Sequence, residues 1–203
     1  CATALEYTIR FMEATKRRGS SWVPAMILLD VKNAFNSASW QQILLRLRNL
    51  KVDEYLIDLV ASYFKDRTLN LEGKVLKLTS GVPQGSVLGP TLWNVLIDPI
   101  TQIDLPDFCD MVVYADDIAL LVGAKNGNEM RHRGNLALKR TQEKLKTLGL
   151  ELATEKTTAL IARGKRTSIP RDTKFLIGED EIKNKDAVKY LGVHIDAELT
   201  FKK

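Results

Sequence analysis

Cysteine and histidine are scarce in this chain of 203 residues, and their positions exclude several kinds of site. The two cysteines, Cys1 and Cys109, form neither a metal-ligand pair nor a disulfide framework. The two histidines, His132 and His194, have no partner at zinc-ligand spacing. A disulfide-stapled fold and a structural zinc site are therefore excluded, and a reducing, intracellular setting fits best.

Long apolar runs are also missing. The longest, such as residues 26–29 and 118–122, are far too short to span a bilayer, and no signal peptide is visible. We therefore expect no membrane association. The chain starts without methionine and stops just after a strand-like run, so we expect it to be an excerpt from a longer polypeptide.

The composition is that of a globular protein, with 45% hydrophobic and 27% charged residues. By length it is one domain or one large piece of a bigger domain. The formal charge of +5 and the pI of about 9.1 suit a nucleic-acid partner. Many basic proteins bind no nucleic acid, so composition alone does not decide the function.

Apolar spacing predicts an α+β layout with helices on one side of an antiparallel sheet. The predicted strands cover residues 23–31, 111–115, 118–122, 158–162, 174–177 and 188–195, with a hairpin over 68–79. The predicted helices start near residue 3, cover 40–47 and 52–64, start again near 91, and end with a long helix carrying Leu138, Leu145, Leu148 and Leu152 on one face.

Two carboxylates stand together where two apolar strands meet, in Tyr114-Ala115-Asp116-Asp117. A two-residue hairpin turn favours Asn-Gly or Asp-Gly, so Asp-Asp is a poor choice for the turn itself. The two charges also repel each other, and each carboxylate taken out of water costs several kcal/mol. A divalent cation such as Mg²⁺ would offset both penalties.

Asp30 ends another apolar strand, 86 residues before Asp116. If the two strands are neighbours, Asp30 and Asp116 can share metal ions. Two such ions would lower the pKa of an attacking hydroxyl and stabilise a leaving phosphate group. The alternative is that these are solvated turn aspartates, which for Asp117 alone is equally plausible.

A second pattern is the loop over residues 80–90, which holds three glycines and two prolines and precedes an apolar helix. Glycine lets the backbone approach a ligand closely. Gln84 in this loop is able to hydrogen-bond a nucleotide or a template sugar. The alternative is a structural loop that only starts the helix, and a glycine-rich loop by itself is weak evidence.

Four segments resemble reverse transcriptases, in the order seen in that family: DVKNAFNSASW from Asp30, SGVPQGSVLGP from Ser80, the YADD box and KYLGVHID from Lys189. The residues of these four motifs are most similar to those of non-LTR, LINE-type retrotransposons. The resemblance covers essentially the whole chain. It implies a polymerase palm with an RRM/ferredoxin-like antiparallel sheet, helices on one face, and part of the fingers. The rest of the fingers is expected upstream and the thumb downstream, so 1–203 is a partial reverse transcriptase domain.

The resemblance also implies roles for individual residues. Asp30, Asp116 and Asp117 would be the catalytic acids and metal ligands. Phe35 falls where the family places an aromatic gate that excludes a 2′-hydroxyl, although a core aromatic is the commoner fate of Phe. Lys156 would support the leaving pyrophosphate, and a solvated surface lysine is the alternative.

The remaining implied roles concern nucleic acid and nucleotide. Gln84 and Gly85 fall where the family contacts template and nucleotide, and Tyr114 would face the primer end. Leu191 and Gly192 resemble the primer-grip hairpin, for which the alternative is an ordinary strand with a glycine bulge.

The expected activity is RNA-directed DNA polymerisation with Mg²⁺, for which Mn²⁺ is a substitute. Its partners would be an RNA template, a DNA primer and deoxynucleoside triphosphates, with nuclear access expected from the family. The chain alone is expected to bind these substrates poorly. Three alternatives stay open: a group II intron-type maturase, an inactive or domesticated RNA-binding palm module, and a two-metal nuclease. The sequence leaves the oligomeric state open.

Overall fold

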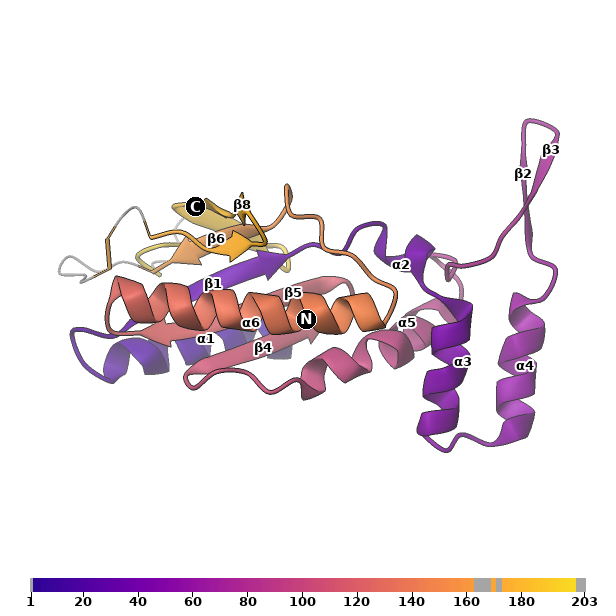
Figure 1. Cartoon of the computed structure of the whole chain (residues 1–203), viewed down its shortest axis with the longest axis horizontal. Coiled ribbons are helices and arrows are strands. Elements are labelled where there is room, and N and C mark those ends of the chain that lie inside the picture. The colour runs from indigo at the N-terminus through magenta and orange to yellow at the C-terminus, as the bar shows by residue number, and fades with distance from the viewer. Residues whose placement is uncertain (1, 163–168, 171–172, 200–203) are drawn as a thin grey trace. The chain divides into compact units, whose positions relative to one another are not determined.

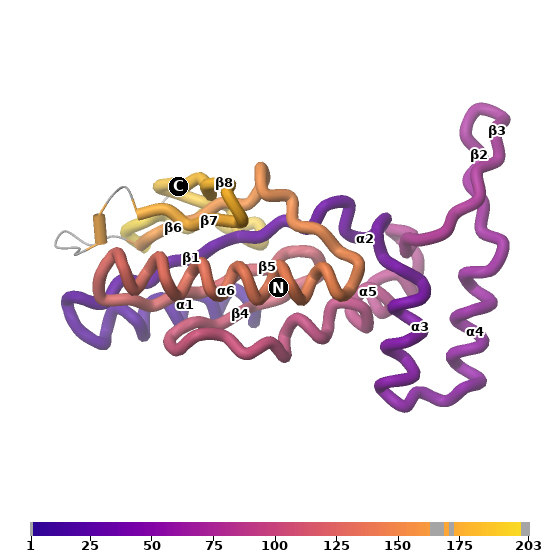
Figure 2. Tube along the Cα trace, in the orientation of Figure 1, coloured from indigo at the N-terminus to yellow at the C-terminus, as the bar shows by residue number. Residues whose placement is uncertain are grey.

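A computed structural model describes residues 2–162, 169–170 and 173–199, which fall into two units. The first, which we call the sheet unit, comprises the described residues within 1–31, 103–143 and 152–203. The second, the helical unit, comprises residues 32–102 and 144–151. Figures 1 and 2 show the elements of both units along the chain.

The sheet unit is built on five strands in the order β4-β5-β1-β6-β9. Their bounds are β1 Val23–Leu29, β4 Cys109–Tyr114, β5 Asp117–Ala124, β6 Thr158–Ile161 and β9 Lys183–Asn184. The pairings are antiparallel except that of β6 with β9, which is parallel. The sheet is therefore mixed, whereas the sequence predicted an antiparallel one; the two-residue strand β9 carries too little pattern to reveal its direction.

One face of this sheet is covered by α1 (Ala2–Arg17) and by a hairpin of β10 (Ala187–Tyr190) and β11 (Val193–Asp196). Met12 of α1 and Val188, Tyr190 and Ile195 of the hairpin join the buried cluster on that face. The long helix α6 (Gly127–Thr147), whose residues up to 143 belong to this unit, crosses the other face (Figure 1). The prediction of helices on one face only is thus wrong for α1, because both faces of the sheet are apolar.

Strand β1 shows why both faces need cover. It lies between β5 and β6, and six of its seven residues are buried. Met26 points to the α1 face and Ile27 to the α6 face, and neither is exposed to solvent. Each such side chain contributes about 1.5–3 kcal/mol through burial. The uninterrupted apolar run in the sequence is therefore the mark of a central strand with two covered faces.

The helical unit holds the segment between the first two strands of the sheet. Its elements are α2 Ala34–Ser37, α3 Trp40–Asn49, α4 Glu54–Phe64, β2 Thr68–Leu71, β3 Lys74–Lys77, α5 Gly89–Ile97 and the 3₁₀ helix η1 Asp98–Gln102. Ser39 caps α3 through Gln42 N, and Asp53 caps α4 through Tyr55 N. Pro99 follows the end of α5, because proline cannot continue an α-helix.

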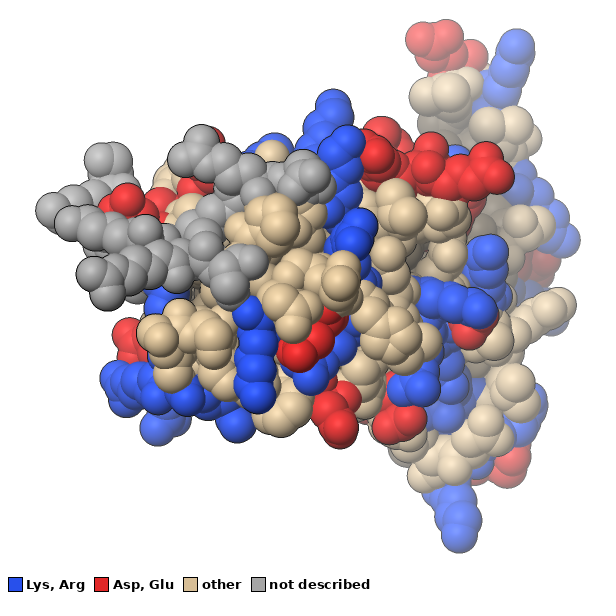
Figure 3. Space-filling model, turned by 60° about the vertical axis from the view of Figure 1, so that its left-hand side comes forward, with Lys and Arg blue, Asp and Glu red and all other residues tan. Residues whose placement is uncertain are grey.

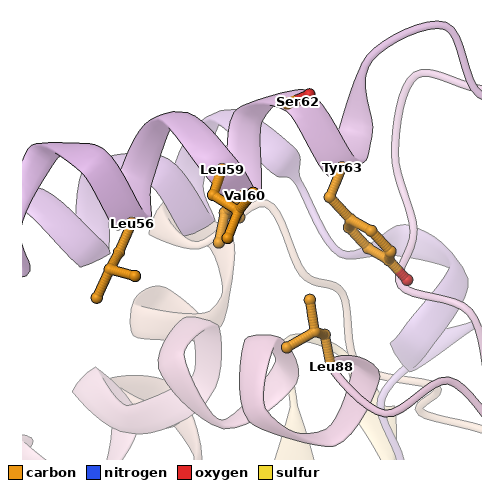
Figure 4. A pocket seen from close by; sticks show the side chains of 6 residues that line it. All are labelled: Leu56, Leu59, Val60, Ser62, Tyr63 and Leu88. Atoms are coloured by element: carbon orange, nitrogen blue, oxygen red, sulfur yellow. The ribbon is translucent and has the colours of Figure 1, made fainter.

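An open apolar groove of about 500 Å³ lies in the helical unit between α4 and the start of α5 (Figure 4). Leu56, Leu59, Val60 and Tyr63 line it from α4, and Leu88 faces them. None of its lining residues is charged. Nucleotide triphosphates need cationic partners for their phosphates, so this groove does not suit them.

Several predicted elements have different bounds in the structure. Helix α6 ends at Thr147, so Leu148 and Leu152 lie beyond it, and Leu152 instead bridges to Val31. The strand predicted over 174–177 is shortened to β7 (Leu176–Ile177), which pairs with β8 (Asp180–Glu181). No helix among the described residues is long and apolar enough to cross a membrane.

The side chain of Tyr190 is buried, and its hydroxyl finds no hydrogen-bond partner among the described residues. The Thr8 hydroxyl lies beside it, but its proton is donated to the Ala4 carbonyl at 3.0 Å. Leaving a polar group buried and unpaired costs about 1–3 kcal/mol. We therefore predict that Tyr190→Phe leaves the free energy of unfolding unchanged or raises it by about 1 kcal/mol, measured by urea denaturation.

Tyr7→Phe is the matched control, because the Tyr7 hydroxyl donates to Asp110 Oδ2. Its loss should lower the free energy of unfolding by about 0.5–1.5 kcal/mol. A loss in Tyr190→Phe as large as that in the control would contradict the unpaired hydroxyl.

Candidate active site

The pairing of β1 with β5 brings two distant carboxylates together. Leu29, the last residue of β1, pairs with Ile118, so Asp30 and Asp117 follow and precede that pair at the same end of the sheet. Leu28 and Ala119 both contact the cluster on the α1 face, and strand alternation places Asp30 and Asp117 on this face too. The condition set by the sequence, that these strands are neighbours, is met.

The electrostatics agree with this proximity. The pKa of Asp117 is raised, first because burial penalises its charged form and then because the Asp116 and Asp30 carboxylates repel a further negative charge. Two other acids at this end of the sheet, Asp116 and Asp30, thus act on the Asp117 carboxyl group. Their common charge makes the site unfavourable without a cation.

The turn between β4 and β5 lies one residue earlier than the sequence predicted. Tyr114 pairs with Asp117, so the central turn residues are Ala115 and Asp116 rather than the two aspartates. Ala115 has φ of +53°, a conformation that costs an L-residue about 1–2 kcal/mol. The Tyr114 side chain next to it is 41% exposed, so it is accessible from solvent.

Lys156 lies beside Asp30, as its predicted role requires. Its Nζ is 4.0 Å from Asp30 Oδ1, while Ala153 N donates to the Asp30 carbonyl at 2.8 Å and fixes the following segment. Both side chains are half-exposed, so this ion pair contributes little to stability. The arrangement leaves the ammonium group able to turn toward an anionic ligand.

The donor set suits a hard cation. Asp30, Asp116 and Asp117 offer carboxylate oxygens, the ligands that Mg²⁺ prefers, and their mutual repulsion is what a divalent cation would relieve. In this conformation no three potential ligand side chains of the described residues converge closely enough to hold an ion by themselves. Magnesium sites commonly complete their shell with phosphate oxygens and water, which fits a site with few protein ligands.

Leu191 and Gly192 form the turn of the β10–β11 hairpin. Tyr190 pairs with Val193, and the two residues between them have φ of +48° and +84°. Two positive φ values are the mark of a type I′ turn, which splits the single strand predicted over 188–195 and replaces the glycine bulge considered for it. Beside this turn, the pKa of Tyr190 is raised first by burial and then by the charge of Asp117.

Phe35 is placed in the helical unit by α2. Its ring is half-buried and stacks on Trp93 of α5, with the centroids 5.1 Å apart and the planes at 26°. Its carbonyl accepts a hydrogen bond from Val82 N at 2.8 Å. The ring is thus held by both its stacking partner and its backbone, and the loop after Ser80 runs directly beside it.

The loop over residues 80–90 is tied to the segment after α2. Gly81 N donates to the Ala38 carbonyl at 2.8 Å, and Trp40 Nε1 donates to the Gly81 carbonyl at 2.7 Å. A Cβ on Gly81 would lie 2.9 Å from the Asn36 carbonyl oxygen, so only glycine fits there. Gln84 and Gly85 follow at the exposed part of the loop, and the loop brings them into the same unit as Phe35.

Sequence reasoning missed two residues that support these side chains. Trp93 is fully buried, and the Phe35 ring stacks on it. The sequence indicated only that Trp93 belongs to an apolar helix. Ser86 Oγ donates to the Pro83 carbonyl and accepts from Gly89 N, closing the loop around Gln84 and Gly85. A serine three residues before the start of a helix was the signal that could have revealed the second.

Net charge does not mark the site. On the face shown in Figure 3, lysine and arginine side chains lie between acidic and uncharged ones, without a single basic patch. The location of the site therefore rests on the acids and the strand register.

Comparisons with known proteins agree with this geometry. Residues 5–195 match the family described as reverse transcriptase (RNA-dependent DNA polymerase). The Pol polyprotein of the type-1 retrotransposable element R1 of Bradysia coprophila is 26% identical over 86% of this chain and 17% of its own length. The Pol polyprotein of the type-1 retrotransposable element R2 of Nasonia vitripennis is 30% identical over 82% of this chain and 18% of its own length. The RNA-directed DNA polymerase of the mobile element jockey of Drosophila melanogaster is 28% identical over 85% of this chain and 20% of its own length.

These matches confirm the resemblance to LINE-type elements, and the chain spans a fifth or less of the length of these relatives. Among solved structures, apo telomerase of Candida tropicalis without its C-terminal domain superimposes with a TM-score of 0.64 at 16% identity, covering 99% of this chain and 39% of that one. Telomerase of the same species in complex with a fragment of telomeric RNA gives 0.65 at 14%, covering 99% and 32%. The fold is thus a mixed α+β polymerase palm.

The strained turn at Ala115 yields a test of stability. Ala115→Gly removes the cost of a positive φ at an exposed position, so the free energy of unfolding should rise by about 1 kcal/mol. Ala14→Gly, at an exposed position inside α1, is the matched control and should lower it by about 1 kcal/mol. Equal losses in the two variants, measured by urea denaturation, would show that the turn carries no strain.

Proposed function

Because the chain belongs to the reverse transcriptase family, we propose that it carries out RNA-directed DNA synthesis as part of a non-LTR retrotransposon polymerase. The observation that carries this proposal is the β1–β5 register, which places Asp30 beside Asp117 on one face of the sheet. A protein that only bound RNA would gain nothing from three acids there, since carboxylates repel phosphates.

Reverse transcriptases generally use divalent metal ions, and Asp30, Asp116 and Asp117 would hold them here. When bound, Mg²⁺, or Mn²⁺ in its place, would lower the pKa of a primer 3′-hydroxyl and neutralise charge on the leaving pyrophosphate. The protein's own part is to position the reacting groups, which is most of the work in phosphoryl transfer. Lys156, 4.0 Å from Asp30, would add a positive charge for the pyrophosphate.

The other residues would order the substrates. Phe35, backed by Trp93, would lie under the sugar of the incoming nucleotide and leave no room for a 2′-hydroxyl. Gln84 and Gly85 would contact template and nucleotide from the exposed part of their loop. Tyr114 and the Leu191–Gly192 turn would face the primer.

The partners that follow are an RNA template, a DNA primer and deoxynucleoside triphosphates. Such an enzyme acts on chromosomal DNA, so access to the nucleus is part of the proposal. The upstream fingers and downstream thumb expected from the family would hold these substrates more firmly than this segment alone.

Primer extension on an RNA template annealed to a DNA primer tests the proposal. The wild type should extend the primer with Mg²⁺ or Mn²⁺. Asp30→Asn and the double variant Asp116→Ala, Asp117→Ala should lose extension about 100- to 1000-fold, as expected when charge stabilisation is removed. The double variant Glu179→Ala, Asp180→Ala, which removes two exposed acids, is the matched control and should keep full activity.

If no protein extends the primer, the assay is repeated with the upstream and downstream segments restored. If the longer protein also extends no primer and binds RNA without metal ions, the polymerase proposal is wrong and the chain is an RNA-binding palm module. Cleavage of the template by the wild type would favour the two-metal nuclease instead.

Sugar selectivity tests the gate separately. Phe35→Val should raise incorporation of ribonucleotides relative to deoxynucleotides by about tenfold or more, because a smaller side chain admits the 2′-hydroxyl. Phe35→Tyr keeps the ring and should keep the selectivity. The ratio of kcat/KM for the two nucleotides is the measurement, and an unchanged ratio in Phe35→Val would remove the gate assignment.

A further inference from the structure

A second open groove lies in the sheet unit, between α6 and the β7–β8 hairpin, and has a volume of about 670 Å³. We call it the basic groove. Arg131 and Lys139 line it from the helix, and Lys174 and Glu181 line it from the hairpin side. None of these residues belongs to the site described above, so the groove needs its own explanation.

The walls of the groove are held at a fixed spacing. A Cβ on Gly134, in the middle of α6, would lie 2.3 Å from Phe175 Cε1, so the helix and the segment leading into the hairpin meet at a position that only glycine permits. The Phe175 ring is fully buried there. Asn135 Oδ1 accepts a hydrogen bond from Leu176 N at 3.0 Å. Glycine inside a helix costs about 1 kcal/mol, and here this close contact offsets it.

Positive charge dominates the lining, with three cations against one carboxylate. Lys174 pairs with Glu181 at 2.5 Å. Lys139 is 4.0 Å from Glu143, both well exposed, which leaves it almost fully available to a ligand. Arg131 donates to the neutral Asn128 side chain at 2.8 Å, so its charge is not neutralised by that contact.

Between the cations the lining is apolar. Leu136 lies on the helix side, and Leu176, 39% exposed, lies on the hairpin side. Cations flanking apolar side chains match the chemistry of an unpaired polynucleotide, which presents phosphates on its outside and base faces for contact. A duplex stacks its bases inside and would use only the cations.

The groove is separate from the acids. Strand β5 runs from Asp117 to Ala124, about 23 Å along the strand, and α6 begins three residues later. Helix α6 also crosses the face of the sheet opposite to the one that carries the acids (Figure 1). A strand in the groove would therefore not occupy the primer site.

From these observations we infer that the basic groove binds an unpaired stretch of the RNA template outside the primer duplex. The inference rests on the proposed function for the presence of an RNA template. Asn128 and Asn135 place amide groups along the groove that are able to hydrogen-bond the ribose 2′-hydroxyl.

Binding of a labelled 20-nucleotide unpaired RNA, followed by fluorescence anisotropy at several salt concentrations, tests this inference. The variant carries Arg131→Gln, Lys139→Gln and Lys174→Gln. Losing three phosphate contacts should weaken binding about tenfold or more at 0.1 M salt and reduce the slope of log K against log salt by about 2. The control variant carries Arg10→Gln, Arg17→Gln and Lys146→Gln, which removes the same charge from exposed positions outside the groove. It should bind within twofold of the wild type.

A primer-template whose RNA extends only two nucleotides beyond the primer separates the groove from the chemistry. The groove variant should extend it at the wild-type rate and lose rate only on templates with a long unpaired extension. Equal RNA affinity of groove variant and wild type would overturn the inference, whatever the extension assay shows. If the groove variant loses RNA affinity while neither it nor the wild type extends a primer, the result supports RNA binding in the groove and contradicts the proposed polymerase activity. An equal loss for single-stranded DNA of the same sequence would overturn the assignment to RNA.

Discussion

The site depends on one constraint, the register of β1 against β5. Asp30 and Asp117 are 87 residues apart in the chain, and only the Leu29–Ile118 pair brings them to one end and one face of the sheet. A slip of one residue would turn every side chain of β1 to the opposite face and carry Asp30 away from Asp117. The apolar side chains on both faces of β1 prevent this slip. After a slip, each of them would lie on the opposite face of the sheet and lose the side chains against which it now packs. The core therefore fixes the geometry of the chemistry.

The stability of that core permits unfavourable features where the chain turns near the acids. Ala115 and Leu191 both adopt positive φ in two-residue turns, where Asn or Gly would be easier to accommodate. Asp117 adds a carboxyl group whose raised pKa records burial and repulsion by its neighbours. Strained turns and crowded charges at one end of a sheet are common where function rather than stability selects the residues. Their coincidence here is independent support for placing the site at this end.

Much of the fold was predictable because its signals are local. The apolar run of β1, the caps and stripes of the helices and the strand pair around Asp116 follow from residue spacing. Two predictions failed because they depend on contacts far apart in sequence: the cover that α1 gives to the second face, and the parallel pairing of β9. The end of α6 at Thr147 has a local cause that the prediction overlooked, because Gly149 has φ of +75° and Leu150 N donates back to the Leu145 carbonyl. The prediction of a single strand over 188–195 failed for a different reason. Leucine rarely adopts positive φ, so Leu191 gave no sign that a hairpin turn interrupts this largely apolar segment. The neighbourhood of Asp30 and Lys156 was predictable only through the family resemblance, while Trp93 under Phe35 required the packed structure.

The acids and the basic groove demand opposite electrostatics, and this explains their separation. Acids that are to hold cations must not be neutralised by nearby arginine or lysine, while cations that hold phosphates must not be cancelled by carboxylates. At physiological ionic strength exposed charges are screened beyond about 8 Å. The sheet itself lies between the acids and the groove, because α6 crosses the face of the sheet opposite to the one that carries the acids. Lys156 is the exception at 4.0 Å from Asp30, and its half-exposed pair is weak enough to give way to a phosphate without occupying the acid. A single sheet can thus attract the backbone of one strand on one face and carry bare carboxylates on the other.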